Sequence, residues 1–365
     1  MVEAGIAGPV LAAFVFSLAL CMAIVATQRW HGRFSHDCAF GVQKFHIDPT
    51  PRIGGAALGL AYWLVWPLLP PDLATLWAQI GLAATPALLA GLVEDITKRV
   101  PTRIRLFATM GAGALFVVTT GYAMAEVDVP GVDWLLSFSI GALLFTAFAM
   151  GGVANAVNII DGFNGLASGS CLIMLAAFAF VAERAGDPVV FQLALLYAGL
   201  IAGFFVVNFP FGKLFLGDGG AYLSGFLLAS LGVLIVMRNP EVSAWAAMLV
   251  CGYPVIETLA SMRRKSRRDG YSMSVPDRVH FHMLAYRRYG RRLVPRHLPR
   301  RLRNPATSVV TWAFPLTTSA FVMLSWNSAV LSAAFFVLAA YLYGAIYGVM
   351  SLNRTRVPRG LSRLF

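Results

Sequence analysis

The stretch Asn155-Ala-Val-Asn-Ile-Ile-Asp161-Gly-Phe-Asn164-Gly-Leu-Ala-Ser168 places two amides and a carboxylate at the end of a long apolar run. Helix residues three apart share a face, so a helix that continues through Asp161 keeps Asn155, Asn158 and Asp161 on one arc. The glycines that follow favour a sharp turn and the close approach of a ligand. A structural alternative is that these side chains only cap a helix where it leaves a membrane. We expect a functional carboxylate at a chain reversal.

The composition excludes a soluble globule. The chain has 365 residues, is 58% hydrophobic and 13% charged, and has a mean hydropathy of +0.70. Its charged share is about half of that usual in soluble domains. The formal net charge is +12, but Lys and Arg collect on the cytoplasmic side of membrane proteins, so no nucleic-acid partner is expected. The four cysteines show no Cys-x-x-Cys spacing, which indicates neither a disulfide framework nor a zinc site.

Apolar windows of about 20 residues suit helices that cross a bilayer. They predict an all-α polytopic integral membrane protein with about eleven transmembrane helices. The first window lacks a clear cleavage site after it and is interpreted as a retained anchor. The eleven windows lie near residues 4–26, 53–70, 73–93, 105–123, 134–155, 166–182, 189–207, 219–237, 242–260, 307–326 and 328–350.

The basic residues predict the orientation. With the N-terminus outside, all of the 29 Lys and Arg residues except Arg184 and Arg238 fall on one side of the membrane. The C-terminus and every basic loop are therefore expected in the cytoplasm. The resulting organisation is one transmembrane domain over residues 1–365, with cytoplasmic loops at 27–52, 94–105, 156–165, 208–218 and 261–306.

Five carboxylates fall at the cytoplasmic ends of the predicted spans: Glu94, Asp95, Asp161, Asp218 and Glu257. Clustered like charges repel unless a cation compensates them, so the convergence indicates a site that handles anions with the help of a cation. Adjacent helix residues point about 100° apart, so one of Glu94 and Asp95 is expected to face the ligand and the other to support it. We favour Asp95 as the facing residue. The alternative is that the pair only binds the neighbouring cations.

Two loops combine cations with glycines. Lys44 and Arg52 lie in the first loop, where they would bind phosphate or simply follow the positive-inside rule. Lys213 precedes Gly217-Asp218-Gly219 without the spacing of a Walker loop. Free N–H groups at the start of the next helix would still bind an anion, and Asp218 is available for a metal.

The last cytoplasmic loop contains Asp277-Arg278-Val-His280-Phe-His282. On a helix the two histidines diverge by about 200°, whereas an extended segment brings them to one side. The histidines and the surrounding cations would contact phosphate oxygens, or the cations would only bind anionic lipid headgroups.

Five motifs, in their order along the chain, resemble those of the polyprenyl-phosphate N-acetylhexosamine-1-phosphate transferases. They are Glu94-Asp95, the Asn155-x-x-Asn-x-x-Asp-Gly segment, Gly217-Asp218-Gly219, Tyr253-Pro-Val-Ile-Glu257-Thr and the final loop motif. The chain looks like the branch that starts O-antigen, enterobacterial common antigen or teichoic acid synthesis. The resemblance implies ten or eleven helices in the bacterial inner membrane and a cytoplasmic Mg²⁺ site, with Mn²⁺ as an alternative. It implies transfer of a phospho-aminosugar from a UDP-N-acetylaminosugar to undecaprenyl phosphate, with release of UMP.

The resemblance also implies residue roles. Asp218 would be the magnesium ligand, Asp95 and Asp161 the other essential carboxylates, and Asn155, Asn158, His280 and His282 the nucleotide and phosphate contacts. From the residues themselves we add Glu94 to the catalytic group and Asp95 as a second metal ligand. Substrate binding is also expected of Lys44, Lys213, Asp277 and Arg278. The chain departs from the family pattern at Glu94, Asn164, Glu257 and Met283, and these departures leave the sugar open.

Charge explains why such a site needs cations. A lipid phosphate carries about −1.5 to −2 at pH 7, so it is already a nucleophile, and its repulsion from the donor diphosphate must be offset. We expect direct in-line attack, with a covalent Asp-phosphate as the rival mechanism. The other functions considered are a flippase for an anionic polyprenyl lipid, an inactive relative and the peptidoglycan-branch transferase of phospho-MurNAc-pentapeptide. The oligomeric state stays open, with a homodimer as one option.

Overall fold

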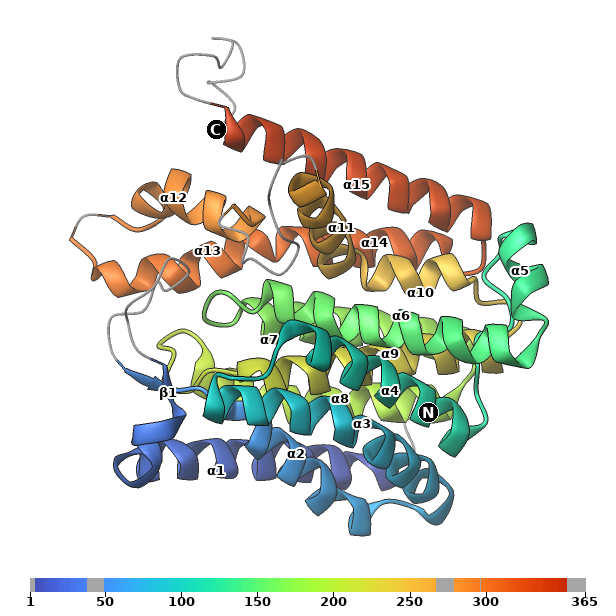
Figure 1. The fold of residues 1–365 in the computed structure, drawn as a ribbon, viewed down its shortest axis with the longest axis horizontal. Coiled ribbons are helices and arrows are strands. Elements are labelled where there is room, and N and C mark those ends of the chain that lie inside the picture. The colour runs from blue at the N-terminus through green and yellow to red at the C-terminus, as the bar shows by residue number, and fades with distance from the viewer. Residues whose placement is uncertain (1–3, 38–48, 267–278, 296, 353–365) are drawn as a thin grey trace.

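The computed structural model describes residues 4–37, 49–266, 279–295 and 297–352, and almost all of its regular structure is helical. Figure 1 shows the long helices running roughly side by side in a bundle. The two strands of the described part, β1 (His36–Asp37) and β2 (Thr50–Pro51), form a short antiparallel pair. The predicted all-α class is confirmed.

The first part of the chain supplies most of the long helices. They are α1 (Ala4–Ser35), α2 (Gly54–Val65) with the 3₁₀ turn η1 (Trp66–Leu68), α3 (Pro71–Thr97), α4 (Thr102–Thr120), α5 (Pro130–Leu136), α6 (Ser139–Ile160), α7 (Leu166–Ala185), α8 (Pro188–Asn208) and α9 (Gly217–Arg238). The remaining elements are α10 (Ala244–Val250), α11 (Gly252–Ser266), α12 (Phe281–Leu293), η2 (Arg300–Leu302), α13 (Arg303–Thr311), α14 (Ala313–Ser325) and α15 (Ala329–Ser351).

Eight helices of the described part are long and apolar enough to cross a membrane. The helices α10 and α11 would make a ninth span, bent by 81° where they meet. The short apolar segment Gly54–Leu68 and the helix α4, which carries two arginines near its start, fall outside this set. A multi-pass helical protein is thus supported, whereas the number eleven stays a prediction.

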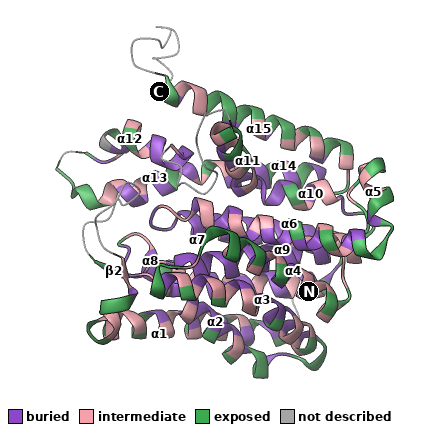
Figure 2. Ribbon diagram, viewed as in Figure 1, coloured by how far each residue is buried: buried purple, intermediate pink, exposed green. Residues whose placement is uncertain are grey.

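Helix α9 lies at the centre of the bundle, and 83% of its apolar window is buried. Figure 2 shows this helix among buried residues, while α5 and α15 carry many exposed ones. Small residues explain the close packing. A Cβ atom at Gly91 of α3 would collide with the backbone at Gly219 of α9, and one at Gly55 of α2 would collide with Gly220. Such small contact residues let helix backbones approach closely in a membrane, where packing drives association.

This packing brings several helix ends together at one end of the bundle. The start of α9 lies against the start of α2 and the end of α3. The end of α6 reaches the same place, since Asn158 contacts Asp218. Helix α1 begins at one end of the bundle and α15 finishes at the other (Figure 1).

Candidate active site

Asp95 holds the N-terminus of α9. Its side chain comes from the last turn of α3 and is fully buried. Oδ1 accepts the backbone N–H of Asp218 and Oδ2 accepts that of Gly219, each at 2.9 Å. A helix leaves its first N–H groups without partners, and a carboxylate at that end also complements the helix dipole. Asp95 therefore fixes the position of the Asp218 backbone.

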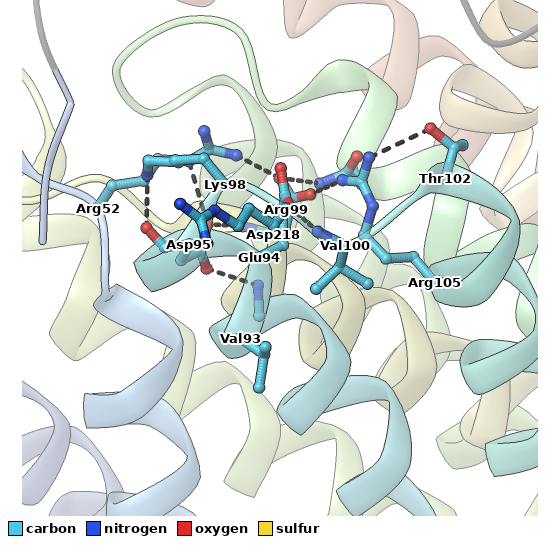
Figure 3. A network of polar contacts seen from close by, with 12 residues as sticks. Arg52, Val93, Glu94, Asp95, Lys98, Arg99, Val100, Thr102, Arg105 and Asp218 are labelled. Carbon is cyan, nitrogen blue, oxygen red and sulfur yellow. Dashed lines mark hydrogen bonds and ion pairs between the residues drawn. The ribbon is translucent and has the colours of Figure 1, made fainter. Parts of the chain in front are cut away.

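Asp218 stands in the first turn of α9 and is 5% exposed. Its Oδ1 accepts hydrogen bonds from Nη2 of Arg52 and, at 3.1 Å, from Nδ2 of Asn158. Its Oδ2 accepts one from Nη1 of Arg105. Arg52 also reaches Asp95, with its Nε 3.1 Å from Oδ1. Figure 3 shows the two arginines converging on Asp218 from different elements.

These charges compensate one another. Two buried carboxylates face two guanidinium groups, and burying a charge is costly unless it is paired in this way. Although burial disfavours the cation, Asp218 and Asp95 raise the pKa of Arg52 above its usual range. Around Asp218, anionic oxygen is therefore matched by hydrogen-bonding cations.

Glu94 and Asp95 separate as the sequence predicts, because they are adjacent on a helix. Glu94 turns away and accepts the backbone N–H of Val100 at 2.8 Å, which closes the turn after α3 (Figure 3). Lys98 lies in the left-handed region with φ of 57° and donates to the backbone oxygen of Asp95. Glu94 thus supports the turn and does not reach Asp218.

Asp161 follows the end of α6. The helix stops at Ile160, so the expected helical arc does not continue through Asp161, which has φ of −77° and ψ of 67°. Burial raises the pKa of its carboxyl to about 7; the cation of Arg52 opposes this rise, and the like charges of Asp218 and Asp95 add to it. Asp161 is therefore near the pair of carboxylates, as expected.

The two asparagines of the opening stretch do different things. Asn158 donates to Asp218. Asn155 lies nearly one turn earlier and donates at 2.8 Å both to Oγ1 of Thr109 on α4 and to the backbone oxygen of Gly151. Its amide is thus used between α6 and α4.

Glu257 forms a second centre, on α11. It is fully buried. Its oxygens accept from the hydroxyl of Tyr343 at 2.6 Å and from Nη2 of Arg264 at 3.1 Å, and Nδ1 of His280 lies 2.9 Å away. The backbone N–H of Phe281 binds the same carboxylate at 3.2 Å. Glu257 therefore holds the start of α12 against α11 and α15.

The two histidines come together because His280 has extended backbone, with ψ of 151° before α12. Their rings stack with centroids 5.6 Å apart. His282 is 1% exposed, and neither of its ring nitrogens has a hydrogen-bond partner among the described residues. Its ring covers Gly162 and meets the edge of Phe163, next to Asp161. Burial, followed by the charge of His280, lowers the pKa of His282 to about 3.

The other residues predicted to bind substrate either lie away from Asp218 or fall outside the described residues. Lys213 is exposed on the loop between α8 and α9. Lys44, Asp277 and Arg278 lie outside the described residues. Arg52 and Arg105 both contact Asp218, although the sequence points to no role for Arg105 beyond its charge and leaves that of Arg52 open. The sequence signal for these two arginines is their position. Arg105 lies in the first turn of the apolar helix α4, and Arg52 lies just ahead of the apolar helix α2.

The carboxylate oxygens of Asp218 suit Mg²⁺, a hard divalent cation that needs few protein ligands. Among the described residues no group of three or more His, Cys, Asp and Glu side chains is arranged to hold a metal. Mg²⁺ commonly uses one or two carboxylates and completes its shell with water and substrate phosphates. Asp218, with Asp95 behind it, matches that pattern, and the guanidinium groups on Asp218 show that this position accepts positive charge.

Comparisons with known proteins agree with this arrangement. The model of glycosyl transferase family 4 matches residues 77–236, which run from α3 to α9 and include Asp95, Asp161 and Asp218. A probable undecaprenyl-phosphate N-acetylglucosaminyl 1-phosphate transferase of Bacillus subtilis is 27% identical over 244 residues, covering 66% of each chain. A decaprenyl-phosphate N-acetylglucosaminephosphotransferase of Mycolicibacterium smegmatis is 27% identical over 276 residues, covering 65% of each.

A phospho-N-acetylmuramoyl-pentapeptide-transferase of a Geobacillus strain is also similar, at 27% identity over 224 residues, covering 58% of this chain and 67% of that relative. The chain thus matches slightly less than two thirds of the length of the first two relatives. The matched region contains the α3, α6 and α9 residues that meet at Asp218. The resemblance to polyprenyl-phosphate N-acetylhexosamine-1-phosphate transferases is confirmed by the match of residues 77–236 to the model of glycosyl transferase family 4 and by the similarity to these relatives.

Proposed function

We propose that the protein transfers an N-acetylaminosugar 1-phosphate from a UDP-sugar to undecaprenyl phosphate and releases UMP, as the first membrane step of a cell-surface polysaccharide pathway. The observation that carries the proposal is the meeting of Asp95, Asp161 and Asp218 with two arginines at one end of a bundle of apolar helices. The similarity to the two N-acetylglucosamine-phosphate transferases, of Bacillus subtilis and Mycolicibacterium smegmatis, supports the same reaction.

The site suits a reaction between two anions. The acceptor phosphate and the donor diphosphate repel each other, and phosphoryl transfer depends on positioning the groups and offsetting their charge. Arg52 and Arg105 supply fixed positive charge, and Asp218 would hold Mg²⁺, or Mn²⁺, against the donor oxygens. Bound there, the ion would polarise the phosphorus–oxygen bond that breaks.

The side chains would divide the work. Asp95 is occupied by backbone N–H groups and by Arg52, so it would act by orienting Asp218. Asp161 has a carboxyl that titrates near neutrality, so it would accept the residual proton of the acceptor phosphate. His280 and His282 would contact the donor, with His282 offering a neutral ring. The attack would be direct and in line.

The membrane arrangement follows the positive-inside rule. We infer eleven spans in a bacterial inner membrane, with the N-terminus outside and the site facing the cytoplasm, where UDP-sugars are made. The basic residues near the site, including Arg52, Arg103 and Arg105, support this orientation.

The test uses purified protein in detergent with undecaprenyl phosphate and a panel of UDP-sugars, including UDP-GlcNAc and UDP-MurNAc-pentapeptide. We expect UMP release with an N-acetylaminosugar donor, its loss on chelation of divalent cations, and a fall of at least 100-fold in Asp218→Asn. The matched control is Asp133→Asn, because Asp133 binds backbone N–H groups of a loop between α4 and α6. Release of UMP from the muramoyl-peptide alone would favour the peptidoglycan reaction, to which the Geobacillus relative points. Lipid movement without UMP release would favour a flippase.

A further inference from the structure

Both oxygens of Asp218 accept hydrogen bonds from nitrogen donors. Oδ1 takes Arg52 and Asn158, and Oδ2 takes Arg105 alone. A divalent cation bound at Oδ2 would sit beside a guanidinium group, and like charges at that range repel strongly. A cation can therefore use Oδ2 well only if Arg105 leaves it.

Of the two arginines, Arg105 is the one that can leave. Arg52 is tied to Asp95 through Nε and to Asp218 through Nη2, and its backbone N–H donates to Ser35 at 2.8 Å. Besides Asp218, Arg105 interacts with the side chain of Tyr222 and makes a long hydrogen bond of 3.3 Å to Thr102 in its own first turn. Arg52 thus bridges two carboxylates, whereas Arg105 reaches only one.

Arg105 also has an unused donor. Its Nε is buried and has no hydrogen-bond partner among the described residues. A buried donor of a charged group without a partner is costly, so the protein gains if an acceptor arrives. Phosphate oxygen is the acceptor that suits a guanidinium best, because several N–H groups can bind one phosphate at once.

We propose that Arg105 occupies the cation position at Asp218 in the substrate-free protein and transfers to the donor diphosphate when a divalent cation takes its place. The inference rests on the proposed function, because it assigns Arg105 a place in that site. No covalent step is involved. One ion pair, Arg105 with Asp218, is exchanged for two, the divalent cation with Asp218 and Arg105 with diphosphate.

Charge balance gives the exchange a measurable consequence. Asp95, Asp218 and, when it is ionised, Asp161 face the two cations Arg52 and Arg105, so adding a divalent cation alone still leaves an excess of positive charge. A UDP-sugar brings about −2 on its diphosphate and removes that excess. The cation and the donor must therefore bind cooperatively, and by linkage each raises the affinity for the other by the same factor.

The experiment measures binding without turnover. Mn²⁺ affinity is determined by electron paramagnetic resonance in the absence of nucleotide, and UDP-GlcNAc affinity is determined by calorimetry with and without saturating Mg²⁺. In Arg105→Met we expect Mn²⁺ to bind about tenfold more tightly than in wild type, because its competitor is gone. We expect UDP-GlcNAc to bind about tenfold more weakly in Mg²⁺, because the diphosphate has lost a partner.

The matched control is Arg103→Met, which removes the same charge from the same turn of α4 at an exposed side chain. It should leave both affinities unchanged, and Arg105→Lys should keep much of the Mg²⁺–donor coupling. Unaltered thermal unfolding of each variant shows that it is folded, and Asp218→Asn identifies the Mn²⁺ site. If wild-type Mn²⁺ binding depends on Asp218 but Arg105→Met binds Mn²⁺ no more tightly than wild type, the proposed exchange of Arg105 is wrong while the proposed function stands. Absence of Asp218-dependent Mn²⁺ binding in wild type, with or without donor, overturns the metal-dependent function as well.

Discussion

At the scale of single residues, the environment of Asp161 is unfavourable to the charge of its carboxylate. Burial raises its pKa from the ordinary 3.8 to about 7. The folded protein therefore binds more protons than the unfolded chain between about pH 4 and pH 7, so this group's contribution to stability is present below pH 4 and is lost as the pH rises through 7.

Asp161→Asn should abolish the loss of stability that accompanies ionisation of this carboxyl, because an amide of similar shape does not ionise. Without divalent cations, the variant should be more stable than wild type at pH 8, by roughly 1 kcal/mol given that the side chain is only partly buried. The difference should shrink as the pH falls through 5 and largely disappear at pH 4. Thermal unfolding in detergent at pH 8 and pH 4 measures it, while UMP release falls. A variant that is less stable than wild type at pH 8 would contradict this account of Asp161.

The sequence locates the acidic residues of the site better than their partners. A carboxylate at the end of an apolar helix is rare enough to be noticed, and Asp95, Asp161 and Asp218 all proved to be neighbours. Arg52 and Arg105 were hidden among the many cations that topology already explains. For Asn155 the sequence predicts substrate binding, but its amide binds Thr109 and so joins α6 to α4. A polar residue within an apolar helix can serve either purpose.

At the scale of helices, the crossing of α3 and α9 positions Asp95 beneath Asp218. A Cβ atom at Gly91 would lie within 3.0 Å of backbone atoms of Asp218 and Gly219, which have no flexible side chain to yield. Gly91→Ala should therefore destabilise the protein by about 1 to 3 kcal/mol, the usual cost of overpacking, and reduce activity. The two measurements are unfolding in detergent and UMP release.

Gly111→Ala is the matched control, because a Cβ atom at Gly111 of α4 meets nothing within 4 Å. It should be neutral, or stabilising by up to about 1 kcal/mol through the better helix propensity of Ala. Equal effects of the two substitutions would show that the crossing of α3 and α9 tolerates a methyl group and does not control the site.

The last helix supports the histidine segment through Tyr343, whose hydroxyl binds the buried Glu257 at 2.6 Å. Tyr343→Phe leaves that carboxylate with one donor fewer, which should cost about 1 to 3 kcal/mol. Because Glu257 holds His280, the KM for the UDP-sugar should rise more than kcat falls. Steady-state kinetics and thermal unfolding measure the two effects. Tyr341→Phe on the same helix is the control, because Tyr341 is 71% exposed; a KM unchanged in Tyr343→Phe would remove α15 from the support of the donor site.

The helix pattern itself was largely predictable, since apolar windows mark most of the long helices. What a window cannot show is a break inside it. The predicted span at 242–260 is two helices bent by 81° at Cys251 and Gly252, so that α11 leaves the direction of α10 and carries Glu257 toward α12 and α15. The histidines likewise meet through one extended residue before α12, which spacing alone left undecided.

At the scale of the whole molecule, the carboxylate site lies beside the end of α1, because the backbone N–H of Arg52 binds Ser35, the last residue of that helix. The start of α1 lies at the other end of the bundle (Figure 1). If that start is outside the cell, the positive-inside rule places the site in the cytoplasm. The segment between α4 and α5, which contains Glu126, should then face outward, and the turn after α3, which contains Arg99, should face inward. Both side chains are exposed, so a cysteine at either position can react without unfolding the protein.

The orientation can be tested with Glu126→Cys and Arg99→Cys, each in a background without the four native cysteines. In spheroplasts, a maleimide that does not cross membranes should label the variant at 126 and should label the variant at 99 only after permeabilisation. Permeabilised labelling of both serves as the control for reactivity. The reverse pattern would put the carboxylates on the outer face, away from cytoplasmic UDP-sugars. The donor chemistry proposed for Asp218 and Arg105 would then be untenable, however well their geometry suited a diphosphate.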